Sequence, residues 1–103
     1  MAETAMLHRD MTITHASLTG LSNAQLLAEV QRLATSERSA TAALIRSLME
    51  LDTRRLYLAE GCASLFGYCT QVLRLSEHAA YGRIEAARAA RRFPAVLDLL
   101  EEP

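Results

Sequence analysis

Apolar residues recur at intervals of three and four along most of the chain, the spacing that places side chains on one face of an α-helix. The first such stripe comprises Leu26, Leu27, Val30, Leu33 and Ala34. Ser22 and Gln25 precede it at the spacing of a capping box, in which each side chain binds the other residue's backbone N–H group. We therefore expect a helix that begins near Ser22 and ends near Ala34.

A second and longer stripe comprises Ala40, Ala43, Leu44, Leu48 and Leu51. Hydroxyl side chains separate the two stripes at Thr35, Ser36 and Ser39, and such side chains favour helix caps over helix interiors. The pattern predicts a break there, followed by a central helix that reaches about Arg55. Apolar residues continue to Gly61, where a glycine predicts the end of a helix.

Two more helices are predicted over residues 64–73 and 77–92, capped by Ser64 and Ser76. The first has an inner face of Leu65, Cys69, Val72 and Leu73, and the second has an inward face of Ala80, Ile84 and Ala87 flanked by Ala79 and Ala90. The joint between them is about three residues long, which is the connection length of a helix-turn-helix.

The C-terminal region predicts one more helix, because a proline disfavours helix in the residue before it and suits a first helical turn. Pro94 therefore ends the helix over 77–92 and starts one that carries Val96, Leu97, Leu99 and Leu100. Residues 1–20 show no sustained period, and we expect a flexible arm there. The expected fold is all-α: one domain over residues 21–103, a small bundle of about five helices with a helix-turn-helix-like pair.

Charge is distributed unevenly, although the chain as a whole carries a net charge of -1. Residues 54–92 hold seven arginines against three acidic residues, the kind of local basic segment that suits phosphate contacts. No apolar run approaches the roughly 18 residues of a membrane span, and the first residues lack the layout of a signal peptide. We therefore expect a cytoplasmic protein with no membrane partner.

The sequence shows no convergent set of reactive groups. His8, His15 and His78 are dispersed, and neither a glycine-rich phosphate loop nor a Ser/His/Asp arrangement is present. We expect no catalysis, cofactor or small-molecule substrate. Cys62 and Cys69 are expected to be reduced and buried, and no zinc site is expected because they and His78 lack a fourth ligand and a recognised spacing.

The basic segment contains one candidate nucleic-acid-binding face. At 100° per residue, Tyr81, Arg88 and Arg92 lie together about 100° from the inward face of the helix over 77–92. Arginine offers a flat donor fork and tyrosine a hydroxyl, and both suit phosphate. The full set of candidate nucleic-acid-binding residues is Tyr81, Arg88, Arg91, Arg92, Arg74, Arg54 and Arg55.

Several neighbouring residues favour other interpretations of this segment. Glu85 lies beside the basic face, and the first turn offers only Glu77 and His78 as polar groups where a helix-turn-helix reads bases. The arginines equally suit a solvated or protein-binding helix. Arg83 projects close to the inward face, so pairing with a buried acid such as Glu60 is expected at least as much as contact with a ligand. In the same way, Asp52 is expected to pair with Arg55.

Four runs of sequence carry a resemblance to a known family: RRLYL (54–58), SLFGYC (64–69), LSEHAAY (75–81) and RIEAARAARRFP (83–94). Through them, residues 51–100 resemble the N-terminal region of bacterial HNH endonuclease proteins. The resemblance implies a helical region that precedes a separate nuclease domain, and the His-Asn-His site of that domain is absent from this sequence. It therefore implies the targeting or assembly part of a nuclease, as a fragment or a stand-alone relative, and does not imply cleavage activity. Gly82 stands where relatives often have another arginine.

Two functions follow from these observations as hypotheses. The first is a non-catalytic module that binds duplex DNA, mainly through its phosphates. The second is a protein-interaction or homodimerisation module, in which Val96, Leu97 and Leu100 and the stripe of Leu26, Val30 and Leu33 pair between copies. The two are compatible, because helix-turn-helix proteins commonly bind DNA as dimers.

Overall fold

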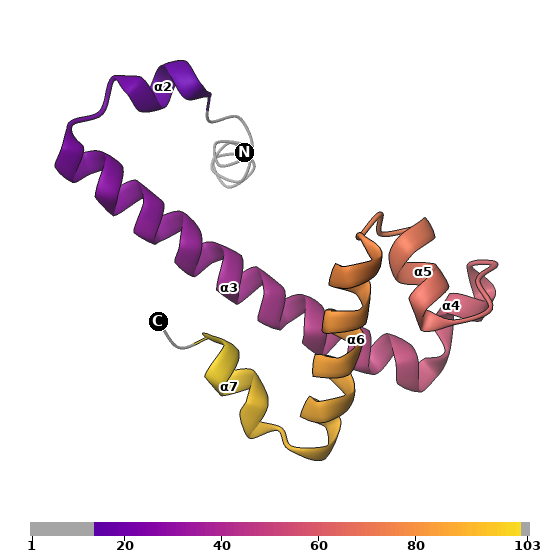
Figure 1. Cartoon of the computed structure of the whole chain (residues 1–103). Helices are drawn as coiled ribbons and strands as arrows, with labels where there is room; N and C mark the ends of the chain where they lie inside the picture. Colours follow the sequence, from indigo (N-terminus) through magenta and orange to yellow (C-terminus); the bar gives the residue numbers. More distant parts are fainter. Residues whose placement is uncertain (1–13, 102–103) are drawn as a thin grey trace, which may run out of the picture. The chain divides into compact units, whose positions relative to one another are not determined.

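The computed structural model describes residues 14–101, and over this range the chain forms six α-helices (Figure 1). They are α2 (His15–Thr19), α3 (Asn23–Arg54), α4 (Leu56–Ala59), α5 (Leu65–Gln71), α6 (Glu77–Arg92) and α7 (Ala95–Glu101). The expected all-α class is confirmed. The chain divides into two compact units, an N-terminal unit that ends at Ala34 and a C-terminal unit that begins at Thr35. This boundary lies beyond the one expected after residue 20, and a single domain over 21–103 stays a prediction.

The N-terminal unit contains α2 and the first part of α3, and side-chain caps hold both helix starts. Thr14 Oγ1 accepts a hydrogen bond from the Ser17 N–H group at 3.2 Å. The Ser22 N–H group donates to Gln25 Oε1 at 2.9 Å, and the Gln25 N–H group donates to Ser22 Oγ at 3.1 Å. The capping box is confirmed. Helix α2 was not expected, and the first 13 residues of the predicted arm lie outside the described part of the chain.

Helix α3 runs without interruption, so the predicted break between the two apolar stripes is wrong. The sequence has no glycine or proline between Leu21 and Glu60, and a threonine or serine inside a helix costs only a few tenths of a kcal/mol, up to about 0.7. Thr35, Ser36 and Ser39 are all exposed. Thr35 Oγ1 even accepts a hydrogen bond from Arg38 Nη2 at 3.1 Å, which keeps the hydroxyl on the helix surface.

The end of α3 and the end of α4 both use left-handed backbone. Arg55 lies between the two helices at φ 53° and ψ 39°, a conformation that is uncommon for a residue with a side chain. Gly61 follows α4 at φ 83°. The Cys62 N–H group then reaches the Tyr57 carbonyl at 2.9 Å, and the Gly61 N–H group reaches the Leu58 carbonyl at 3.1 Å. These two bonds form a Schellman motif, so the expected glycine helix end is confirmed.

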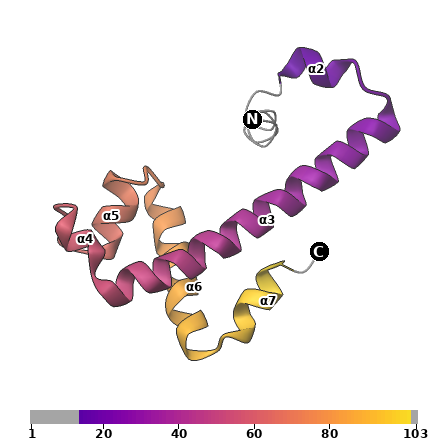
Figure 2. The ribbon, with the colours of Figure 1, turned by 180° about the vertical axis from the view of Figure 1, so that it is seen from behind.

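The core of the C-terminal unit lies where α5, α6 and α7 meet the second part of α3. Helix α6 lies in front of α3 in Figure 1 and behind it in Figure 2, so the two helices cross. The buried cluster comprises Ile45, Leu48, Leu65, Cys69, Ala80, Ile84, Ala87, Ala90 and Leu97. The inward face predicted for α6 is confirmed, because none of Ala80, Ile84 and Ala87 is more than 6% exposed. The small volume of Ala80 and Ala87 lets the helices approach closely.

The joint between α5 and α6 spans residues 72–76 and is longer than expected. The predicted caps are confirmed, since Ser64 Oγ accepts from the Gly67 N–H group at 3.0 Å and Ser76 Oγ from the Ala79 N–H group at 3.1 Å. Arg74 has φ 62°, and after it the Leu75 N–H group donates to the Cys69 carbonyl at 3.0 Å. Val72 is 43% exposed, so its predicted inward position is wrong: α5 ends at Gln71 and the chain turns away.

Helix α7 packs back onto the C-terminal unit, and Leu97 is its buried residue among the side chains described. Leu97 is 8% exposed and belongs to the buried cluster, whereas Leu99 is 65% exposed. Val96 is half-buried, and the side chain of Leu100 lies outside the described part of the structure. Leu97 therefore packs in the core of its own chain.

Candidate nucleic-acid interface

The three residues expected to form the basic face of α6 are all exposed. Tyr81, Arg88 and Arg92 lie at seven- and four-residue spacings, so they share one side of the helix over about 17 Å of its length. We call this surface the α6 face. Over residues 14–101, neither Arg88 nor Arg92 forms a hydrogen bond or an ion pair. Both guanidinium groups are therefore free to bind an anion.

Tyr81 also has a packing role that the sequence did not reveal. Its ring lies 4.7 Å from the ring of Phe66 on α5, between centroids, with a tilt of 33° between the two planes. Tilted aromatic pairs contribute about 0.5–1.5 kcal/mol beyond the area that they bury. Tyr81 nevertheless stays 59% exposed. It thus connects α5 to α6 and remains part of the α6 face.

Arg91 differs from the two arginines around it because it contacts α3. Its Nη2 atom donates to the Met49 carbonyl at 3.1 Å, to Asp52 Oδ2 at 3.2 Å and to Thr53 Oγ1 at 3.3 Å. Asp52 therefore pairs with Arg91, and its expected pairing with Arg55 is wrong, because the turn at Arg55 leaves the helix. The contacts place the last turn of α6 beside the last turn of α3.

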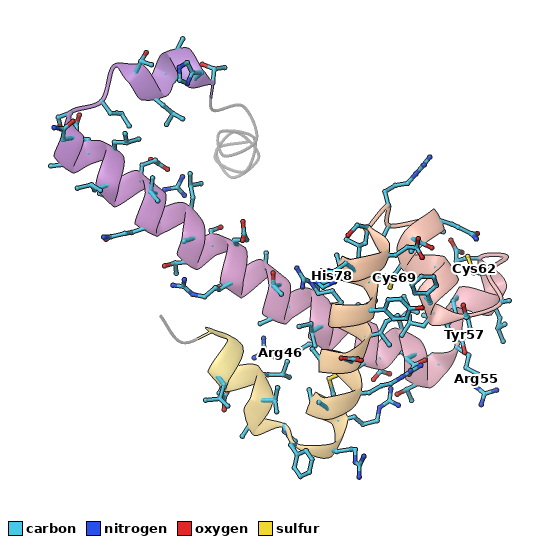
Figure 3. All side chains as sticks on the ribbon, viewed as in Figure 1. Arg46, Arg55, Tyr57, Cys62, Cys69 and His78 are labelled. Atoms are coloured by element: carbon cyan, nitrogen blue, oxygen red, sulfur yellow. The ribbon has the colours of Figure 1, made fainter. Side chains whose placement is uncertain are left out.

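The other expected basic residues fall into two groups. Arg54 is the last residue of α3 and Arg55 follows it, next to the end of α6 that carries Arg92. Arg54 Nε donates to Glu50 Oε2 at 2.7 Å, and Arg55 projects away from the ribbon in Figure 3. Arg74 is exposed but precedes α6, whose 16 residues span about 24 Å, so it is separated from Arg92 by the length of that helix.

The start of α6 carries little that could read bases. Glu77 and His78 are exposed, and Ala80 is fully buried. Glu85 is exposed on the same side of the helix as the α6 face. The structure thus brings together donors that suit phosphate at one end of α6 and leaves the other end with few donors. Arg83 is half-buried and forms no ion pair within residues 14–101; its expected pairing with Glu60 is wrong, because Glu60 is exposed at the end of α4.

The two cysteines occupy the positions expected of small apolar residues. Cys62 and Cys69 are free thiols, 6% and 0% exposed (Figure 3). Burial raises the pKa of the Cys69 thiol, because removal from water disfavours the thiolate. Among the side chains that the structure describes, no three His, Cys, Asp or Glu residues gather where a metal ion could bind. None of the helices in this range is both long and apolar enough to cross a membrane.

Comparison with protein families, with curated proteins and with solved structures finds no match to this chain. The resemblance of residues 51–100 to HNH endonuclease proteins stays a prediction. The assignment of function therefore rests on the residues and on the geometry described above.

Proposed function

We propose that the chain is a non-catalytic DNA-binding module that holds duplex DNA by its phosphates through the α6 face. The observation that carries the proposal is the pair of Arg88 and Arg92, which lie one turn apart, are exposed and have no partner within the described residues. A guanidinium group binds phosphate through two parallel hydrogen bonds. Two such groups on one helix side suit successive phosphates of a strand.

The surroundings of the pair support contact with an extended anion. Arg91 fixes the end of α6 against α3 and so holds Arg88 and Arg92 on a rigid helix. Arg54 and Arg55 lie at the adjacent helix end and enlarge the basic surface. Tyr81 adds a hydroxyl donor at the other end of the α6 face.

The same geometry favours backbone binding over sequence reading. A helix-turn-helix contacts base edges with the first residues of its second helix, and in α6 these residues include the acidic Glu77 and the buried Ala80. We therefore expect similar affinities for duplexes of different sequence. The resemblance to the nuclease family is consistent with a part that holds DNA in the bacterial cytoplasm while another domain cuts it.

Binding of a labelled duplex of arbitrary sequence, followed by fluorescence anisotropy at low salt, tests the proposal. Arg88→Ala and Arg92→Ala are each expected to weaken binding several-fold, because each removes one phosphate contact. Arg32→Ala is the matched control. It removes the same charge from the N-terminal unit, where Arg32 pairs with Glu29, and it should leave the affinity nearly unchanged. Absence of binding, or equal effects of all three changes, would contradict the proposal.

A further inference from the structure

The two parts of α3 carry the same apolar spacing but differ in what covers it. In the C-terminal unit the spacing is formed by Leu44, Ile45, Leu48 and Leu51, and in the N-terminal unit by Leu26, Leu27, Val30 and Leu33, each 18 residues earlier. Ile45 and Leu48 are each 1% exposed beneath the other helices of their unit. Their counterparts Leu27 and Val30 are 64% and 56% exposed. We call Leu26, Leu27, Val30 and Leu33 the N-terminal stripe.

The N-terminal stripe has no cover within the described residues of its unit. Helix α2 is five residues long and buries none of its side chains. A hollow of about 320 Å³ lies on another side of α3, where Leu21, Gln25 and Ala28 contribute to its lining. Most helical stability in proteins comes from packing of an apolar face, so this part of α3 would gain stability from a partner that covers the N-terminal stripe.

The residue types of the stripe indicate which occupant fits. Asn23, Leu26, Val30 and Leu33 follow one another at the alternating three- and four-residue spacing of a heptad repeat. Val30 stands at an a position between leucines at d positions, a combination that favours two parallel strands, and Asn23 stands at the preceding a position, where a polar residue fixes the register. The next a position is Glu37, whose charge ends the repeat.

The charges beside the stripe do not oppose pairing with an identical helix. Glu29 is the charged residue nearest to the stripe within residues 23–34, and it forms an ion pair with Arg32 of its own helix. Two copies in parallel therefore place apolar side chains against apolar side chains and leave this ion pair at the rim.

From this pattern we infer that the N-terminal stripe is a dimerisation surface whose occupant is the same segment of a second copy of the chain, in parallel orientation. The inference does not depend on DNA binding. Two heptads bury less than the roughly 1,200 Å² of a stable interface, so the dimer is weak and forms in a concentration-dependent manner.

Sedimentation equilibrium of the full chain, from about 10 μM to about 1 mM, tests the association. The mass is expected to rise toward that of a dimer over this range. Val30→Glu should keep the chain monomeric throughout, whereas Ala28→Glu, which introduces the same charge about 200° around the helix, should leave the association unchanged. A wild-type mass that stays monomeric, or equal effects of the two changes, overturns the inference. Circular dichroism of both variants checks that the helices remain folded.

A cross-linking experiment tests the orientation. In a parallel pair the two copies of residue 23 face each other, so Asn23→Cys is expected to form a disulfide-linked dimer under mild oxidation. Ala28→Cys, on the opposite side of the helix, should remain monomeric. The native Cys62 and Cys69 are buried and do not compete. If the chain associates but does not cross-link through residue 23, the inferred parallel orientation is wrong.

Discussion

Three arginines within five positions of α6 have different surroundings, although the sequence gives them the same charge. Arg91 donates to three oxygens of α3, whereas Arg88 and Arg92 have no partner among the described residues. The difference follows from the direction in which each residue leaves the helix. Arg91 therefore stabilises the fold, whereas Arg88 and Arg92 are available to bind a ligand.

Replacement of Arg91 tests this separation through stability. Arg91→Ala is expected to lower the free energy of unfolding by about 1 kcal/mol, because it leaves the Asp52 carboxylate without its partner, and solvent partly screens this exposed pair. Arg92→Ala should change the same quantity by less than about 0.5 kcal/mol. Urea denaturation of the two variants makes the comparison. Equal losses would show that the contacts of Arg91 contribute nothing.

The buried thiol of Cys69 predicts a pH dependence of stability. Its pKa lies above the ordinary value of 9.0, so the thiol stays protonated in the folded protein while the unfolded chain already ionises. The stability that the neutral Cys69 thiol contributes is therefore complete below pH 9.0, and it is lost as the pH rises from there toward the pKa of the folded protein. Denaturant titrations at about pH 8 and about pH 10 should show a larger fall for the wild type than for Cys69→Ala. If stability fell equally in the wild type and in Cys69→Ala, the raised pKa of the Cys69 thiol would be contradicted.

At the scale of elements, local signals in the sequence predicted most of the helices. Serine caps at Ser22, Ser64 and Ser76 and the glycine after α4 were all found where expected. The break in α3 was predicted wrongly, because the preference of Thr35 and Ser36 for caps is weak beside the continuity of the flanking helical segments. The short α2 has too few residues to show a period.

The candidate site was less accessible to sequence reasoning than the helices were. A helical wheel placed Tyr81, Arg88 and Arg92 on one side of α6. It contained no information on contacts between distant segments, such as Arg91 with Asp52, or Tyr81 with Phe66. Those contacts depend on how helices pack, and no local signal encodes them.

The glycines of two elements predict stability changes of opposite sign. Gly82 lies within α6, and apart from its chain neighbours and the backbone of its own helix a Cβ atom there would meet nothing within 4 Å. Gly82→Ala should therefore raise the free energy of unfolding by about 0.5–1 kcal/mol. Gly61→Ala has equal space but requires φ 83°, and it should lower stability by about 1 kcal/mol or more. Thermal or urea unfolding of both variants measures the two changes in stability. If both changes had the same sign, the explanation from backbone conformation would be wrong.

At the scale of the whole molecule, the two units carry different kinds of surface. The C-terminal unit has a packed core and exposes the arginines of the α6 face, whereas the described N-terminal unit exposes an apolar stripe. The overall net charge of -1 conceals this division, since residues 54–92 are basic and the segments on either side are acidic. The proposed DNA contact and the proposed self-association therefore use separate surfaces, and we expect that either can be removed by mutation without loss of the other.

The most direct test of the central claim is the salt dependence of duplex binding, compared between the wild type and the double variant Arg88→Ala/Arg92→Ala. Each phosphate neutralised by an arginine contributes about 0.9 to the slope of log K against log salt. We expect a steep decrease of affinity with salt for the wild type, and a slope shallower by about 2 for the double variant. No binding at low salt, or an unchanged slope after loss of both arginines, would contradict the account.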